Sequence, residues 1–173
     1  NADPAPFYDT FRHGPVSFIV LDAGETGHSR CSLHSGKAVY EEYLEEQIRW
    51  AREAMQESLF SSAPMQVCLI HVPMIDHPDQ TDYLLQRWLN VHFLPLLEEA
   101  GVDLMISADL HEFMYCESGM MGATFPILVN DDLRRLDCSY DSGRFTMKMF
   151  DASGEEEFST VLEIESYDRC SLQ

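Results

Sequence analysis

The sequence predicts an α/β fold, with a mixed sheet and an antiparallel meander at its C-terminal end. Over the first two thirds of the chain, short apolar runs alternate with long segments whose apolar residues recur every three to four positions. Over the last third, short apolar runs follow one another with turn sequences between them. Alternating strands and helices favour a parallel or mixed sheet, and the terminal strands extend that sheet or add a second layer.

The chain begins with a predicted hairpin. Residues 6–13 alternate aromatic and polar side chains, and Gly14-Pro15 is typical of a turn. The continuous apolar run from Val16 to Leu21 then indicates a strand buried on both faces. Residues 24–38 show no apolar periodicity and are predicted to form a loop.

Two helices and two further strands are predicted next. Val39 to Leu59 has an apolar face at helical spacing and several Glu in its first turns, where the helix dipole favours negative charge. Met65 to Ile70 is predicted as the second central strand. Thr81 to Ala100 is predicted as a helix, capped by Thr81 or Asp79, that Pro95 should kink or break in two. Asp103 to Ser107 is the third central strand.

The last third is predicted to be an antiparallel meander. Its turns are expected at 141–143 and at 153–154, where Gly follows Ser. Its expected strands are Glu112 to Glu117, Thr124 to Val129, Leu133 to Tyr140, Phe145 to Phe150 and Phe158 to Ile164. We interpret residues 1–2 as the remnant of a cleaved expression tag, 3–165 as one domain portion and 166–173 as a tail.

Composition limits the possible partners. The 173 residues carry a formal net charge of -19, with 30 acidic against 11 basic side chains. Nucleic acids and anionic membranes both require Lys and Arg to neutralise phosphates, so neither is expected as a partner. A substrate that bears phosphate stays possible if bound cations reverse the local charge.

The five cysteines do not form a recognisable framework. Their number is odd, their spacing is irregular and the sequence holds no C-x-x-C pair, which argues against disulfide scaffolds and zinc ribbons. Cys68 and Cys116 lie in apolar runs and are predicted to be core residues.

Three side chains at two strand ends are the candidate metal ligands. His71 follows the strand that ends at Ile70, and Pro73 stops regular structure two residues later. Asp109 and His111 lie in a short loop after the next strand. Ligands tend to cluster where the strands of an α/β sheet open into loops. The alternatives are a hydrogen-bonded strand-end histidine for His71 and a turn residue for Asp109.

The remaining polar candidates show weaker patterns. Asp22 and Glu25 follow a central strand and are interpreted as loop-capping groups rather than ligands. Asp76 and His77 lie in the loop predicted at residues 72–80, where exposure to solvent is favoured over contact with a substrate. His92 lies inside a predicted helix, where a histidine with an ordinary hydrogen-bond partner is expected.

Together these segments resemble a known enzyme family. His71-Val72-Pro73, then G-V-D-L, then Ala108-Asp109-Leu110-His111 resemble the C-terminal half of calcineurin-like metallophosphoesterases, near the purple acid phosphatase branch. The hairpin Y-D-T-F-R-H-G-P-V-S-F-I-V-L-D-A-G-E is similar to that family's mid-chain hairpin. The resemblance runs from about Phe7 to Ile164, and its strength lies in the order and spacing of short motifs.

The resemblance implies a metal-dependent phosphoester hydrolase. By it, His71, Asp109 and His111 stand where the family ligates a centre of two divalent ions, such as Mn, Fe or Zn, with a phosphoester as substrate. Asp109 replaces the first His of the family's Gly-His-x-His motif, and Ala108 replaces its Gly. Asp can bind a divalent metal through oxygen, but it favours a harder ion than His does.

The family's N-terminal metal-binding motifs are missing here. Asp-x-His, Gly-Asp-x-x-Asp and Gly-Asn-His-Glu do not occur, and His28 and His34 lie in the wrong place to replace them. The chain is therefore expected to be half of such an enzyme, truncated or degenerate, and half of its four-layer α/β/β/α sandwich. Alone, it is expected to bind one metal ion or none and to be inactive.

Two functions follow from this reading. The first is a hydrolase fragment that supplies the last ligands of a two-metal site, with the missing N-terminal half as its partner. The second is a non-catalytic binding or assembly module on the same scaffold, with no metal. In either case half a sandwich exposes a sheet face, so a homodimer is expected. The cellular compartment is not predicted.

Overall fold

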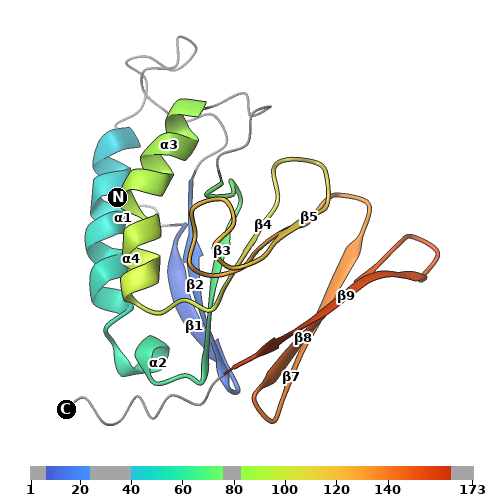
Figure 1. The fold of residues 1–173 in the computed structure, drawn as a ribbon. Coiled ribbons are helices and arrows are strands. Elements are labelled where there is room, and N and C mark those ends of the chain that lie inside the picture. The colour runs from blue at the N-terminus through green and yellow to red at the C-terminus, as the bar shows by residue number, and fades with distance from the viewer. Residues whose placement is uncertain (1–6, 24–39, 76–82, 165–173) are drawn as a thin grey trace, which may run out of the picture.

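The structure is a computed structural model that describes residues 7–23, 40–75 and 83–164. In these ranges a six-stranded mixed sheet lies between a layer of helices and a three-stranded antiparallel sheet (Figure 1). This arrangement confirms the predicted α/β class. The predicted loop at 24–38, the caps Asp79 and Thr81, and the tail lie outside the described residues.

The N-terminal hairpin has the predicted form. Strand β1 (Asp9–His13) pairs antiparallel with β2 (Val16–Leu21), and Phe11 faces Phe18 across the pair. Gly14 takes a φ of 58°, which the tight turn requires and which glycine adopts without steric cost. Strand β2 is largely buried, as its continuous apolar run predicted, and β3 lies on its other side.

The six-stranded sheet brings four strand ends to one edge. Its order is β1-β2-β3-β4-β6-β5, in which β2, β3, β4 and β6 run parallel. The new members are β3 (Met65–Ile70), β4 (Leu104–Ser107), β6 (Ile127–Val129) and β5 (Met114–Cys116). Because parallel strands end together, the segments that follow β3, β4 and β6 start side by side.

The predicted single helix from Val39 to Leu59 is wrong, because the structure has two helices there. Helix α1 (Tyr40–Ala54) ends where the N–H groups of Gln56 and Glu57 bond the carbonyls of Glu53 and Ala54, three residues back. Such bonds tighten the last turn and end a helix. The short helix α2 (Ser58–Ser61) then turns Phe60 into the core.

The second helical segment breaks at its proline, as predicted. Helix α3 (Tyr83–His92) ends before Phe93, and α4 (Leu94–Glu99) begins there with Pro95 in its first turn. Proline lacks an N–H group, so it is tolerated at the start of a helix and not in its interior. Gly101, with a φ of 73°, closes the segment.

The C-terminal meander is smaller than predicted. Only β7 (Arg135–Asp141), β8 (Arg144–Phe150) and β9 (Glu156–Glu163) form it, as consecutive antiparallel strands. The strands predicted within residues 112–117 and 124–129 belong to the first sheet instead, as β5 and β6. All three residues of β6 are buried, which fits a central strand covered on both faces.

Two apolar cores hold the three layers together. The larger core joins the helices to one face of the six-stranded sheet and includes Phe60, Leu89 and Leu97. The smaller core joins the other face to β8, whose Phe145, Met147 and Met149 are buried.

The two predicted core cysteines lie within this interior. Cys68 is inaccessible to solvent, and Cys116 is 2% exposed. Both have free thiols. The prediction that they are buried core residues is therefore confirmed. Burial raises the pKa of each thiol, because a thiolate is poorly solvated there.

Candidate functional site

The candidate site lies where β3 and β4 end. The carbonyl of His71 accepts a hydrogen bond from the N–H of Ala108 at 3.0 Å, which joins the segments after the two strands. After His71 the chain turns inward: Val72, Met74 and Ile75 are buried. The Nε2 atom of Gln86 donates to the carbonyl of Pro73 at 3.1 Å. His71 is thus held on a segment that is anchored on both sides.

The loop after β4 is unusually tight. The N–H of Leu110 bonds the carbonyl of Ala108 at 2.8 Å, only two residues back. Asp109 and His111 have φ angles of 68° and 54°. For residues other than glycine, this conformation costs on the order of 1–3 kcal/mol and is concentrated at functional sites. Two further residues, Met121 and Ser142, have similar φ angles in other turns, but Asp109 and His111 are the two that were predicted as ligands.

The structure brings two of the three predicted ligands together. The Nε2 atom of His71 lies 3.5 Å from Oδ1 of Asp109, and the two side chains are 50% and 37% exposed. The Nδ1 atom of His111 lies 3.9 Å from Oδ2 of Asp132, and the His111 side chain is 78% exposed. His111 therefore has a different neighbour from the other two. Asp132 was not among the residues predicted from the sequence.

A shallow, open hollow of about 410 Å³ adjoins His71. Its base consists of apolar side chains from β2, β3 and β4, including Val20, Leu69 and Ile106. Its polar lining comes from His71, Ser107 and Asn130. The hollow thus has a polar rim at the strand ends and an apolar floor.

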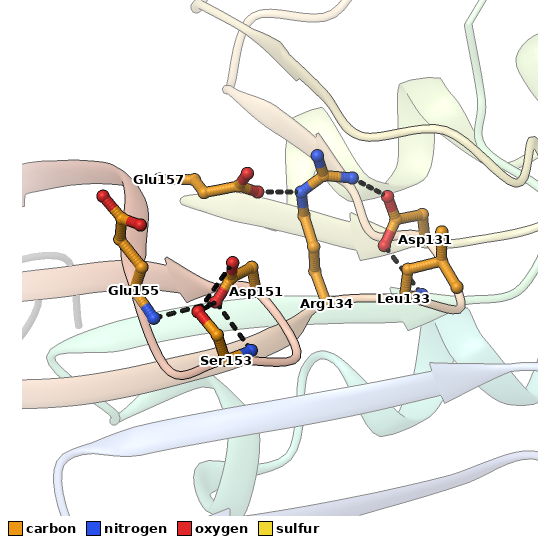
Figure 2. A network of polar contacts seen from close by, with 7 residues as sticks. All are labelled: Asp131, Leu133, Arg134, Asp151, Ser153, Glu155 and Glu157. Atoms are coloured by element: carbon orange, nitrogen blue, oxygen red, sulfur yellow. Dashed lines mark hydrogen bonds and ion pairs between the residues drawn. The ribbon is translucent and has the colours of Figure 1, made fainter.

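An ionic network fixes the segment that follows β6 (Figure 2). Arg134 bonds the carboxylates of Asp131 and Glu157, and the N–H of Leu133 donates to Asp131 at 3.0 Å. Burial raises the pKa of Asp131, but its bonds to Leu133 and Arg134 outweigh this, so the net pKa is lowered. Because Glu157 belongs to β9, the network ties the segment after β6 to the second sheet.

A second network closes the turn between β8 and β9. Asp151 accepts bonds from the N–H groups of Ser153 and Glu155 at 2.9 and 2.8 Å (Figure 2). The Ser153 hydroxyl bonds to the same carboxylate, and this bond is the main cause that lowers the pKa of Asp151. These hydrogen bonds cap the turn between β8 and β9, which accounts for the polar groups of Asp151 and Ser153.

The described residues fit part of a metal site. His71 and Asp109 offer one nitrogen and one carboxylate donor at a common point. Within residues 7–23, 40–75 and 83–164, no three His, Cys, Asp or Glu side chains lie close enough to hold an ion. A two-metal centre needs roughly seven or eight ligands. The described part of the chain therefore does not contain a closed two-metal site.

The other polar candidates have ordinary roles where they are described. Asp22 accepts a hydrogen bond from the Tyr43 hydroxyl at 2.9 Å, and Gln47 bonds both the N–H and the carbonyl of Asp22. Asp22 thus joins the end of β2 to α1, which agrees with a capping role. The ring of His92 lies 4.3 Å from that of Trp88 on the same helix. Glu25, His28, His34, Asp76 and His77 lie outside the described residues.

Comparisons with known proteins show a fold and no family. No protein-family model and no curated protein matches the sequence. The chain is similar to a solved structure described as GAP50, the anchor in the inner membrane complex of Plasmodium, with a TM-score of 0.61 and 14% identity. That likeness covers 94% of this chain and 55% of the other. This chain thus spans about half the length of that structure, with which it shares a fold.

A second structure is more distant. It is described as a putative 5'-nucleotidase from Staphylococcus aureus in complex with alpha-ketoglutarate. The TM-score is 0.37 and the identity 12%, with 91% of this chain and 29% of the other covered.

Proposed function

We propose that this chain is part of a metal-dependent phosphoester hydrolase and supplies His71, Asp109 and His111 to its metal centre. The observation that carries the proposal is the pairing of His71 with Asp109 at 3.5 Å, at the ends of adjacent parallel strands. The tight loop after β4, in which Asp109 and His111 both have positive φ angles, supports it. The reaction class, hydrolysis of a phosphoester, follows from the resemblance of the segments around His71 and Asp109 to metallophosphoesterase motifs.

In this proposal the chain contributes one side of the site. Divalent ions in such a centre supply an activated water and neutralise charge on the phosphoryl oxygens. The chain itself fixes the positions of the ligand side chains. The anchored segment after β3 fixes His71, and the tight loop after β4 fixes Asp109. The net charge of -19 would repel a phosphoester. Bound cations are therefore needed for substrate binding as well as for reaction.

The test compares this chain with the complete gene product. Metal content and hydrolysis of p-nitrophenyl phosphate would be measured for both, with Mn²⁺, Zn²⁺ and Fe²⁺. We expect little or no turnover by the isolated chain. We expect turnover by a longer product that carries the missing motifs. In the longer product, H71A should reduce kcat/KM by more than about 100-fold, since even the partners of metal ligands matter by about 10–100-fold.

Two outcomes would contradict the proposal. An inactive, metal-free full-length product would exclude the hydrolase. Robust turnover by the isolated chain would show that the ligand count is wrong. The H92A variant is the matched control, because the His92 ring packs against Trp88 and does not line the hollow, so its loss should leave kcat/KM unchanged.

A second candidate is a non-catalytic binding or assembly module on the same scaffold. One specific observation favours it: His111 pairs with Asp132, so the three predicted ligands do not converge in the described chain. The likeness in fold to a protein described as an anchor is compatible with it. If this candidate is right, the full-length product binds no metal through His71, Asp109 or His111. The measurement of metal content described above therefore separates the two candidate functions.

A further inference from the structure

Three strand ends, and not two, meet at the candidate site. The N–H of Ala108 bonds the carbonyl of His71, and the N–H of Asn130 bonds the carbonyl of Ser107 at 2.7 Å. These bonds continue the ladders of β3 with β4 and of β4 with β6 beyond the strands. Leu69 pairs with Ile106, which pairs with Leu128. Two residues further along each strand, the same row contains His71, Ala108 and Asn130.

This row places His71 and Asn130 on the same face with a small residue between them. Side chains two positions apart on a strand point to the same face, so His71 and Asn130 share the face of Leu69 and Leu128. Neighbouring strands are about 4.8 Å apart, so the two residues flank a gap of about 10 Å between their backbones. Ala108 contributes only a methyl group to that gap. All three residues line the hollow.

Two residues that line this hollow each carry a side-chain oxygen with no explained role. Oδ1 of Asn130 and Oγ of Ser107 are buried, and neither has a hydrogen-bond partner among the described residues. Ser107 as a whole is only 4% exposed. A buried polar atom without a partner costs roughly 1–3 kcal/mol, so such atoms call for an explanation, for example an ion or a water.

We infer that the amide oxygen of Asn130 is a third ligand of one divalent cation, together with Nε2 of His71 and Oδ1 of Asp109. This inference rests on the proposed function and adds a residue to its site. All three atoms are acceptors that suit a hard or borderline ion such as Mn²⁺. The acidic chain raises the local concentration of cations, which favours occupancy.

The test measures Mn²⁺ binding to the chain itself, without substrate. Free Mn²⁺ would be followed by electron paramagnetic resonance in 0.3 M salt, which screens non-specific attraction to the acidic surface. We expect one site per chain. N130A should weaken Mn²⁺ binding at least tenfold, and H71A should do the same. N130D, which keeps an oxygen in place and adds charge, should bind at least as tightly as the wild type.

A matched control separates ligation from stability. Asn90 on α3 also has a buried amide oxygen without a partner among the described residues, but it does not line the hollow. N90A should therefore bind Mn²⁺ like the wild type. Circular dichroism would verify that each variant is folded. If N130A does not fold, Mn²⁺ binding by N130D tests the role of Asn130 instead.

The outcomes distinguish this inference from the proposed function. Equal binding by N130A and the wild type, with loss in H71A, would overturn the role of Asn130 and leave the proposed metal centre in place. Equal loss in N90A and N130A, or no Mn²⁺ site in the wild type, would also overturn it. A cation site that depends on Asn130 in a full-length product without hydrolysis would support the inference and exclude the hydrolase.

Discussion

The side chains of this protein differ sharply in how much their surroundings constrain them. Asp109 and His111 have unfavourable backbone angles that only a fixed loop can maintain, whereas their side chains are partly or largely exposed. Asp131 differs from them in that its side chain is only 3% exposed. We therefore expect substitutions at the first pair to affect function and substitutions at Asp131 to affect stability.

Replacement of Asp131 should destabilise the fold in a way that depends on pH. D131N removes a buried carboxylate bonded to Arg134 and Leu133, and we expect a loss of about 1–3 kcal/mol in the free energy of unfolding at pH 7. Because folding lowers the pKa of Asp131, its stabilisation is complete above the unfolded value of about 3.9. It is lost as the pH falls through the lower folded value.

Urea unfolding of wild type and D131N at pH 7 and at pH 3 measures this effect. The difference between the two proteins should be smaller at pH 3. D137N is the control, because Asp137 also pairs with an arginine but is 49% exposed, and an exposed pair contributes at most about 1 kcal/mol. A larger loss for D137N than for D131N would contradict the argument.

Helices and strands here are divided by local chemistry as well as by apolar pattern. The apolar period continues from α1 into α2 and from α3 into α4, yet each pair is broken. Pro95 predicts the break between α3 and α4 from the sequence, because the effect of proline on a helix is local. The first break has no such residue, and it follows from the need to turn Phe60 into the core. The apolar periodicity by itself therefore predicted one continuous helix where the structure has α1 and α2.

The hairpin between β7 and β8 offers a test of turn chemistry. Ser142 and Gly143 have φ angles of 50° and 82°, and a Cβ at Gly143 would lie 3.4 Å from the carbonyl oxygen of Ile164. G143A should therefore reduce the free energy of unfolding by roughly 1–2 kcal/mol. S142A adds no backbone strain and is the control. Thermal unfolding measures both, and equal midpoints would contradict the prediction.

The assembly of layers leaves part of one sheet face uncovered. Strand β8 buries Val67, Leu104 and Leu128, but Phe18 and Ile106 in neighbouring positions are only partly buried. Phe11 is 42% exposed, and its ring stacks on Phe18 at 4.7 Å. Contiguous apolar surface of this kind favours association.

None of the helices in the described ranges is long and apolar enough to span a membrane.

We propose that two copies of the isolated chain pair through this face. Sedimentation equilibrium should show a dimer whose population rises with concentration, and F11S should shift the equilibrium towards monomer. L133S is the control, because Leu133 is 73% exposed in the turn before β7, away from the pair of Phe11 and Phe18. A monomeric wild type at high concentration, or equal shifts in both variants, would contradict the pairing.

Local pattern was sufficient for much of the fold. The hairpin, β3, β4 and the break at Pro95 were predictable because each depends on neighbours in the chain. The assignment of β5 and β6 to the first sheet was not, since strand partners are chosen by burial across the whole sheet. In the same way, His71 and Asp109 could be found as strand-end residues, but the pairing of His111 with Asp132 could not.

Asn130 shows why the remainder was missed. It directly follows a strand, as His71 does, so the same rule could have found it, but an amide does not stand out as a ligand in sequence. Apolar periodicity and turn residues settle which segments become strands and helices, because those preferences act over a few residues. Which strand ends become neighbours depends on contacts between segments more than 20 residues apart. Those contacts alone place Asn130 in one row with His71.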